Sequence, residues 1–185
     1  MIQDTLRAAE EKMKQGIEKM RQEFHAIRTG RAHPAILDSV RVEYYGAMVP
    51  INQVASVSIP EPRLIELKPW DRSVLPELEK AILKSDLGMT PTNDGKVIRL
   101  PLPSLTEERR KELARGVKKI AETYRVAVRN DRRLGVEAVE ALQTDKKISE
   151  DDLHHGKTEL QRLTDQYVAQ IDEILAHKEK EILEG

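Results

Sequence analysis

Apolar residues recur at intervals of three and four along the first 27 residues, and charged residues fill the positions between them. This spacing predicts an amphipathic helix with a single apolar face. Gly30 follows the pattern and is expected to form the C-cap of this helix. The apolar positions are Ile2, Leu6, Ala9, Met13, Ile17, Met20, Phe24 and Ile27.

A second helix-periodic segment begins near Ser104. Ser104 and Glu107 match a capping box, and Thr106 is a rival N-cap. The period is less regular after Gly135, a residue that weakens helices. The apolar face is carried by Leu113, Val117, Ile120, Tyr124, Val128, Val139 and Leu142.

A third helix is predicted to begin after Ser149, which precedes three acidic residues. Gly156 is expected to be a weak point inside it. Long amphipathic helices of this kind gain little stability alone and must bury their apolar faces against one another. The three segments therefore predict a long, narrow antiparallel bundle.

The segment between the first and second helices has a different pattern. All nine prolines of the chain lie between Pro34 and Pro103, and proline is excluded from helix interiors. Alternating residues predict strands at 40–44, 49–51, 57–59, 64–67 and 97–100, with turns at 45–47 and 93–95. Residues 75–87 predict one helix that is ended by Gly88.

These elements predict an α+β protein, in which a long antiparallel three-helix bundle carries a small inserted domain. The bundle is expected to comprise residues 1–30 and 105–185, and the insert residues 31–104. Two short connectors join them, one at Gly30 and Arg31 and the other at Pro103, Ser104 and Leu105. The connectors either end one element and start the next, or form a hinge that allows limited rotation.

The amino-acid composition further limits the kinds of protein that this sequence can be. Charged residues make up 34% of the 185 residues and aromatic residues 3%, and there is no cysteine. This composition fits long surface-charged helices, and it excludes disulfides and thiolate metal sites. The N-terminus has no apolar signal region, and no membrane-spanning run is present, so we expect a cytoplasmic protein.

The net charge of −1 conceals an uneven distribution. Residues 109–133 contain ten Lys/Arg and three Asp/Glu, whereas residues 145–185 contain six and eleven. This pattern has two interpretations: two neighbouring helices that neutralise each other, or a face that binds nucleic acid. The charge pattern by itself favours the first. Arg125, Arg129 and Arg132 nevertheless fall at i, i+4 and i+7, on one helix face, where guanidinium groups could grip phosphates. Arg133 extends this stripe, and Arg110 lies toward its other end.

The motifs of common enzyme classes are missing. The sequence has no phosphate-binding loop, no dinucleotide fingerprint and no HExxH motif. His154 and His155 are adjacent and point about 100° apart on a helix, a poor arrangement for a metal. We therefore expect no catalytic residue, no metal and no cofactor.

Five short stretches, in this order and spacing, make the sequence resemble the ribosome recycling factors of bacteria over essentially its whole length. They are residues 27–32 (IRTGRA) with Pro34, 42–46 (VEYYG), 85–88 (SDLG), 105–110 (LTEERR) and 128–133 (VRNDRR). Asp131 and Leu134 depart from the family pattern, which leads us to expect an apolar residue and an acid at these positions.

The resemblance implies a three-helix bundle and a smaller β/α/β domain arranged like an L. It further implies a monomer that binds in the intersubunit space of the ribosome after termination, where the bundle lies on large-subunit rRNA. Elongation factor G with GTP would then drive separation of the subunits. Arg129 and Arg132 are the strongest candidates for rRNA contact, and Arg133, Arg110, Arg28 and Arg31 are weaker ones. The two connectors match the interdomain hinge of the family.

A coiled-coil scaffold or co-chaperone is the main alternative function. Such a protein would need neither the basic stretch at 109–133 nor a mixed insert. An RNA-processing enzyme is a third hypothesis, and it lacks a plausible set of catalytic residues.

Overall fold

The computed structural model describes residues 1–184, and these divide into two compact units. The first unit comprises Met1–Arg28 and Glu108–Glu184, and we call it the bundle. The second comprises Thr29–Glu107, and we call it the insert. Long helices make up the bundle, while strands and one α-helix make up the insert, so the predicted α+β class is confirmed.

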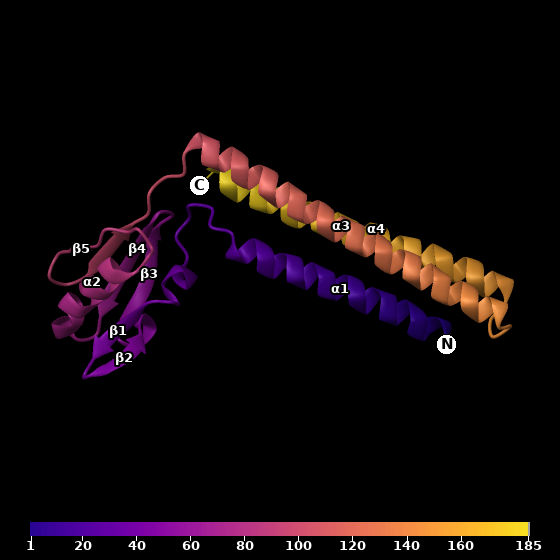
Figure 1. Ribbon diagram of the computed structural model, residues 1–185, viewed down its shortest axis with the longest axis horizontal. Coiled ribbons are helices and arrows are strands. Elements are labelled where there is room, and N and C mark those ends of the chain that lie inside the picture. The colour runs from indigo at the N-terminus through magenta and orange to yellow at the C-terminus, as the bar shows by residue number, and fades with distance from the viewer. Residues whose placement is uncertain (185) are drawn as a thin grey trace. The chain divides into compact units, whose positions relative to one another are not determined.

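Three α-helices form the bundle: α1 (Ile2–Ala26), α3 (Glu107–Thr144) and α4 (Glu150–Glu184). Helix α3 runs antiparallel to α1 and α4, which lie along it (Figure 1). With 38 residues, α3 is about 57 Å long at 1.5 Å per residue. The apolar faces predicted from the sequence pack against one another in the core of the bundle. The buried residues they contribute are Met13, Met20, Phe24, Val117, Ala121, Val128, Leu163, Tyr167, Ile171 and Ile182.

Two glycines predicted to weaken the helices instead allow them to pack closely. A Cβ at Gly135 of α3 would lie 2.8 Å from Cδ2 of Leu160 on α4. A Cβ at Gly156 of α4 would lie 3.0 Å from Cγ1 of Val139 on α3. Helix α3 runs through Gly135 without interruption. Neither glycine interrupts its helix, and each missing side chain makes room for a buried neighbour.

The helix ends correct two further predictions. Helix α1 ends at Ala26, and Ile27 is an extended C-cap, so Gly30 does not cap the helix. Helix α3 begins at Glu107, so Ser104 lies too early to be its N-cap. The predicted start of the third helix after Ser149 is confirmed, and a capping box that was not predicted forms there: Ser149 Oγ accepts from the Asp152 backbone N–H, and Asp152 Oδ2 accepts from the Ser149 backbone N–H.

The insert contains a hairpin and a four-stranded antiparallel sheet. Strands β1 (Arg41–Tyr44) and β2 (Ala47–Pro50) pair through a turn at Tyr45 and Gly46, both at positive φ. The sheet has the strand order β3-β4-β6-β5. Its strands are β3 (Ala55–Glu61), β4 (Leu64–Pro69), β5 (Thr92–Asn93) and β6 (Ile98–Pro101). Helix α2 (Leu75–Lys84) shares a core with the strands.

Every strand predicted in the insert is present, with small shifts at the ends. Helix α2 ends at Lys84, three residues before the predicted Leu87, because Ser85 is already extended. The predicted turn before β6 forms through side-chain acceptors: Asn93 Oδ1 accepts from the Gly95 N–H at 2.8 Å, and Asp94 Oδ1 from the Val97 N–H at 2.8 Å. Strand β5 and the short 3₁₀ helices at Pro34–Leu37, Ile51–Gln53 and Arg72–Val74 were not predicted.

Residues next to both predicted connectors, and Ser104 of the second, are bonded to the turn between β3 and β4. The Ala32 N–H donates to the Pro62 carbonyl at 2.7 Å, and the Leu102 N–H donates to the Arg63 carbonyl at 2.8 Å. Arg63 Nη1 also donates to Ser104 Oγ. These bonds place Ala32, Leu102 and Ser104 within the folded insert.

Candidate nucleic-acid interface

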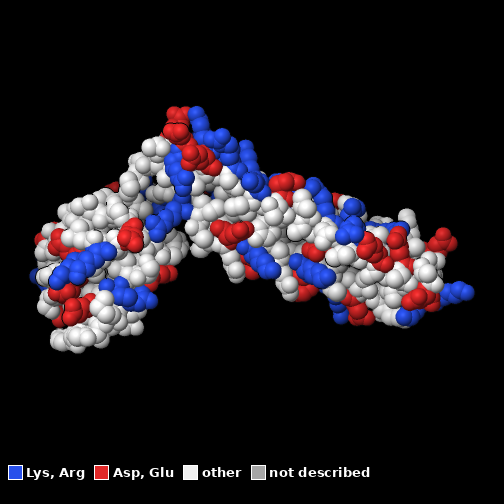
Figure 2. Space-filling view, in the orientation of Figure 1, with Lys and Arg blue, Asp and Glu red and all other residues white. Residues whose placement is uncertain are grey.

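Three of the six candidate rRNA-binding arginines lie together in the middle of α3. Arg129, Arg132 and Arg133 line one hollow of about 630 Å³ on the bundle surface. Val126, Asn130, Val136, Glu137 and Glu140 complete its lining. Figure 2 shows further Lys and Arg side chains along the edge of the bundle that α3 forms, with acidic side chains between them.

Arg129 and Arg133 project outward, one turn apart. Their side chains are 53% and 61% exposed. Arg133 Nη1 donates to Glu137 Oε1 at 2.7 Å, and Arg129 Nη1 lies 3.6 Å from Glu122 Oε1. Exposed pairs of this kind contribute little to stability. These ion pairs therefore do little to hold the two arginine side chains in place.

Arg132 lies closer to α4 and is partly buried. Its Nη1 donates to Oε1 of Gln161 on α4 at 2.7 Å. Its Nε is buried and has no hydrogen-bond partner among the described residues. The guanidinium is thus held by a neutral amide rather than by a carboxylate.

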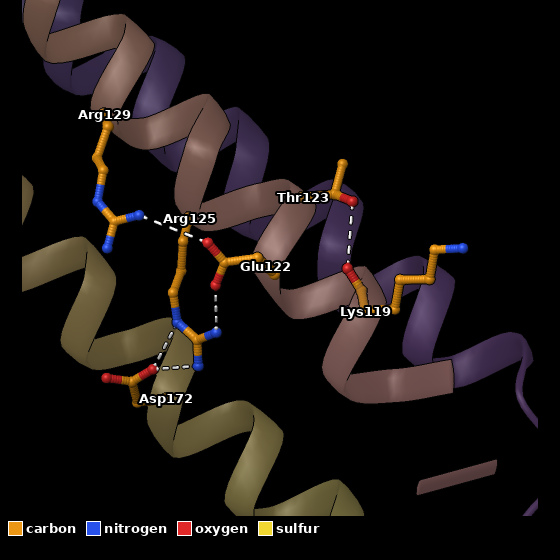
Figure 3. A network of polar contacts seen from close by, with 6 residues as sticks. All are labelled: Lys119, Glu122, Thr123, Arg125, Arg129 and Asp172. Carbon is orange, nitrogen blue, oxygen red and sulfur yellow. Dashed lines mark hydrogen bonds and ion pairs between the residues drawn. The ribbon is translucent and has the colours of Figure 1, made fainter. Parts of the chain in front are cut away.

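Arg125 does not belong to the outward-facing group, although its spacing placed it in the same stripe. Its side chain is only 19% exposed. Nε and Nη2 both donate to Asp172 Oδ1 of α4, at 2.9 and 2.6 Å, and Nη1 donates to Glu122 Oε2 at 3.0 Å (Figure 3). These bonds raise the pKa of the Arg125 guanidinium against the effect of burial. Arg125 is therefore an internal link between α3 and α4.

Arg110 lies near the other end of α3, about 28 Å from Arg129 by helix rise. Its Nη1 donates to the Leu183 carbonyl at 3.5 Å, near the C-terminus of α4 where a cation is favoured. Its Nε is buried without a partner in the described part of the chain. The position gives Arg110 a structural role and keeps it apart from the central arginines.

Arg28 and Arg31 are exposed and lie on different units. Arg28 ends the first segment of the bundle, whereas Arg31 follows Gly30 in the insert. Neither residue lines the hollow on α3. The structure therefore brings three of the six candidates together around the hollow, and the other three do not line it.

Lysine and glutamate side chains form ion pairs between α3 and α4, as the uneven charge distribution in the sequence predicted. Lys118 Nζ lies 3.9 Å from Glu179 Oε1, and Lys157 Nζ lies 2.6 Å from Glu140 Oε1. Neutralisation is only partial, because Arg129, Arg132 and Arg133 remain on the surface around the hollow.

Of the two positions that depart from the family pattern, Asp131 lies between Arg129 and Arg132, and Leu134 follows Arg133. Asp131 is partly buried, and burial raises the pKa of its carboxyl group while the charge of Lys12 on α1 opposes the rise. Leu134 is 39% exposed. Asp131 therefore lies within the influence of Lys12 on α1 and does not line the hollow.

No metal site or membrane span was found in residues 1–184. No three His, Asp or Glu side chains converge there in a way that could hold an ion. None of the helices in the same range combines the length and the apolar character needed to cross a bilayer.

Similarity to known proteins shows which family the chain belongs to. The family model for "Ribosome recycling factor" matches residues 20–183. The chain belongs to the ribosome recycling factor family. Ribosome-recycling factor of Heliobacterium modesticaldum is 54% identical over 184 residues, covering 100% of both chains. That of Carboxydothermus hydrogenoformans is 53% identical over 183 residues, covering 99% of both. The family decides against the scaffold hypothesis.

Solved structures of recycling factors share the fold. A solution structure of a ribosome recycling factor matches with a TM-score of 0.73 and 43% identity, covering 100% of this chain and 98% of the other. Another match has a TM-score of 0.63 and 40% identity, and covers 99% of both chains. It belongs to models for the T. thermophilus ribosome recycling factor and the E. coli elongation factor G bound to the E. coli post-termination complex.

Sequence analysis missed the polar residues that hold the arginines. Asp172 is 47 positions from Arg125, and Gln161 is 29 positions from Arg132, so no local spacing reveals either contact. Glu122, three residues before Arg125, and Glu137, four residues after Arg133, do carry a helix-surface spacing signal.

Proposed function

We propose that this protein recycles ribosomes after termination. It binds in the intersubunit space of a bacterial-type ribosome and, together with elongation factor G and GTP, separates the subunits. Two observations support this: the chain belongs to the recycling factor family, and a related factor is described together with elongation factor G on the post-termination complex.

The single observation that carries the binding mode is the hollow on α3 lined by Arg129, Arg132 and Arg133. We propose that it receives phosphates of large-subunit rRNA. Guanidinium groups match phosphate oxygens in a planar, two-point geometry. The nearby Tyr124 is partly buried rather than displayed for base stacking. Contacts to the RNA backbone and its shape therefore explain binding better than base readout.

In this proposal the protein is not an enzyme and uses no cofactor. It acts in the cytoplasm as a monomer, and nucleotide hydrolysis belongs to elongation factor G. The bundle anchors to rRNA, while elongation factor G acts on the insert and rotates it about the connectors. Hinges of this kind need only a few residues that absorb the change in backbone angles.

Salt-dependent ribosome binding by charge-reversed variants tests the binding mode. The double variant Arg129→Glu/Arg132→Glu should bind at least about tenfold more weakly, since it cannot form charge-assisted hydrogen bonds to phosphate at these positions. The dependence of log affinity on log salt should also become shallower by about 0.9 for each phosphate that is no longer neutralised. Arg21→Glu, at an exposed position of α1, is the matched control. Normal binding by a folded double variant would refute the proposed interface.

A further inference from the structure

We propose that Gln161 is a positioning residue for rRNA binding: it holds the Arg132 guanidinium in its phosphate-binding orientation without neutralising it. This inference rests on the proposed function and adds a residue from α4 to an interface otherwise built on α3. Gln161 itself need not touch RNA.

Two hydrogen bonds fix the side chain of Gln161. Its Oε1 accepts from Arg132 Nη1 at 2.7 Å, and its Nε2 donates to Asp165 Oδ1 at 2.8 Å. Only one orientation of the amide satisfies both neighbours, because the guanidinium needs an acceptor and the carboxylate needs a donor. Asp165 thus orients Gln161, and Gln161 in turn orients Arg132.

The neutral charge of this tether distinguishes Arg132 from the other arginines of this part of α3. Arg125, Arg129 and Arg133 each face a carboxylate, at distances from 2.6 to 3.6 Å. A carboxylate partner competes with phosphate for the guanidinium and weakens its field. An amide oxygen accepts a single N–H and brings no negative charge to the guanidinium.

The packing beneath this contact keeps α3 and α4 close. Leu160, the neighbour of Gln161, is fully buried, and its methyl groups occupy the space left by the missing side chain of Gly135. Gln161 therefore projects from a fixed part of α4 toward Arg132. The buried stem of Arg132, with its enclosed Nε, restricts the guanidinium from the other side.

Pre-orientation removes part of the entropic cost of binding. Immobilising one long side chain at an interface lowers affinity by about 2- to 10-fold. Gln161→Ala should therefore weaken ribosome binding by about that factor while leaving the charge of Arg132 and the slope of log affinity against log salt unchanged. Gln161→Glu should also weaken binding, but its carboxylate should reduce the slope by about 0.9.

Binding to purified 70S ribosomes, measured by pelleting at several salt concentrations, tests the proposal with a double-mutant cycle. The proteins are wild type, Gln161→Ala, Arg132→Ala and the double variant. Gln166→Ala is the matched control, because Gln166 on α4 also accepts from an arginine, at 3.2 Å from Nη1 of Arg162. Far-UV circular dichroism and urea unfolding establish that each variant is folded.

The expected result is a loss of affinity for Gln161→Ala in the wild-type background and none in the Arg132→Ala background. An equal loss in both backgrounds, or no loss in either, would overturn the positioning role while Arg132 remained a binding residue. If Arg132→Ala alone left binding unchanged, the proposed interface would fail, and the role of Gln161 would fail with it.

Discussion

Replacing Gly135 with alanine is expected to destabilise the bundle, whereas the same change at Gly116 is expected to stabilise it. Both glycines lie inside α3, and neither has a positive φ. The Cβ at 135 would stand 2.8 and 3.2 Å from the two methyl groups of Leu160, while the Cβ at 116 would meet nothing within 4 Å. The two substitutions are chemically identical and differ in the space around them.

The magnitude follows from two opposing contributions. Alanine favours the helix over glycine by about 1 kcal/mol at either position. At Gly135 the overpacked Cβ costs about 1–3 kcal/mol, because Leu160 is fully buried and cannot move into free space. The free energies of unfolding of the two variants should therefore differ by about 1–3 kcal/mol, since the helix-propensity contribution cancels in the comparison.

Urea unfolding followed by circular dichroism at the helix band measures this difference, because the bundle holds three of the four α-helices in residues 1–184. In a Leu160→Ala background, Gly135→Ala should no longer destabilise the protein, since the contacting methyl groups are gone. The packing explanation is refuted if Gly135→Ala and Gly116→Ala stabilise the protein equally.

Three further outcomes are expected. Burial, with the bond from its hydroxyl to Glu10, raises the pKa of Tyr167 to about 12. Since an unfolded tyrosine titrates near pH 10, this contribution to stability is complete below about pH 10 and is lost as the pH rises through 12; absorbance titration should show a tyrosine transition at about pH 12, and Tyr167→Phe should remove it. Glu122→Gln should tighten ribosome binding by about two- to fivefold, because an exposed carboxylate no longer competes for Arg129; weaker binding would mean that Glu122 orients the arginine. Gly30→Ala should slow subunit splitting more than it weakens binding, because its φ of +82° disfavours a side chain; equal effects on splitting and binding would argue against a hinge at this connector.

The helices and strands were predictable because their patterns are local. The three- and four-residue spacing from Ile2 to Phe24 needs no knowledge of the partner helices, and it marked the buried face of α1 correctly. The roles of Gly135 and Gly156 were not predictable in this way. A glycine that weakens an isolated helix and a glycine that admits a buried neighbour look the same in a sequence, and only the packing of Leu160 and Val139 distinguishes them.

The candidate site was predictable in part for the same reason. Helical spacing placed Arg129, Arg132 and Arg133 on neighbouring positions of one helix, and the structure gathers them around one hollow. The spacing could not separate Arg125 from them. Its ion pair with Asp172 depends on how α3 and α4 lie against each other, and the two residues are 47 positions apart in the sequence, so no local pattern reveals the pair.

Splitting of post-termination ribosomes, followed by light scattering in the presence of elongation factor G and GTP, tests the proposed function most directly. We predict that the wild-type protein separates the subunits only when both the factor and GTP are present. Arg132→Glu should slow splitting, and raising its concentration should restore part of the rate, because the lesion lies in binding. Failure of the wild-type protein to split ribosomes under these conditions, or unchanged splitting by Arg132→Glu at limiting concentration, would contradict the proposal.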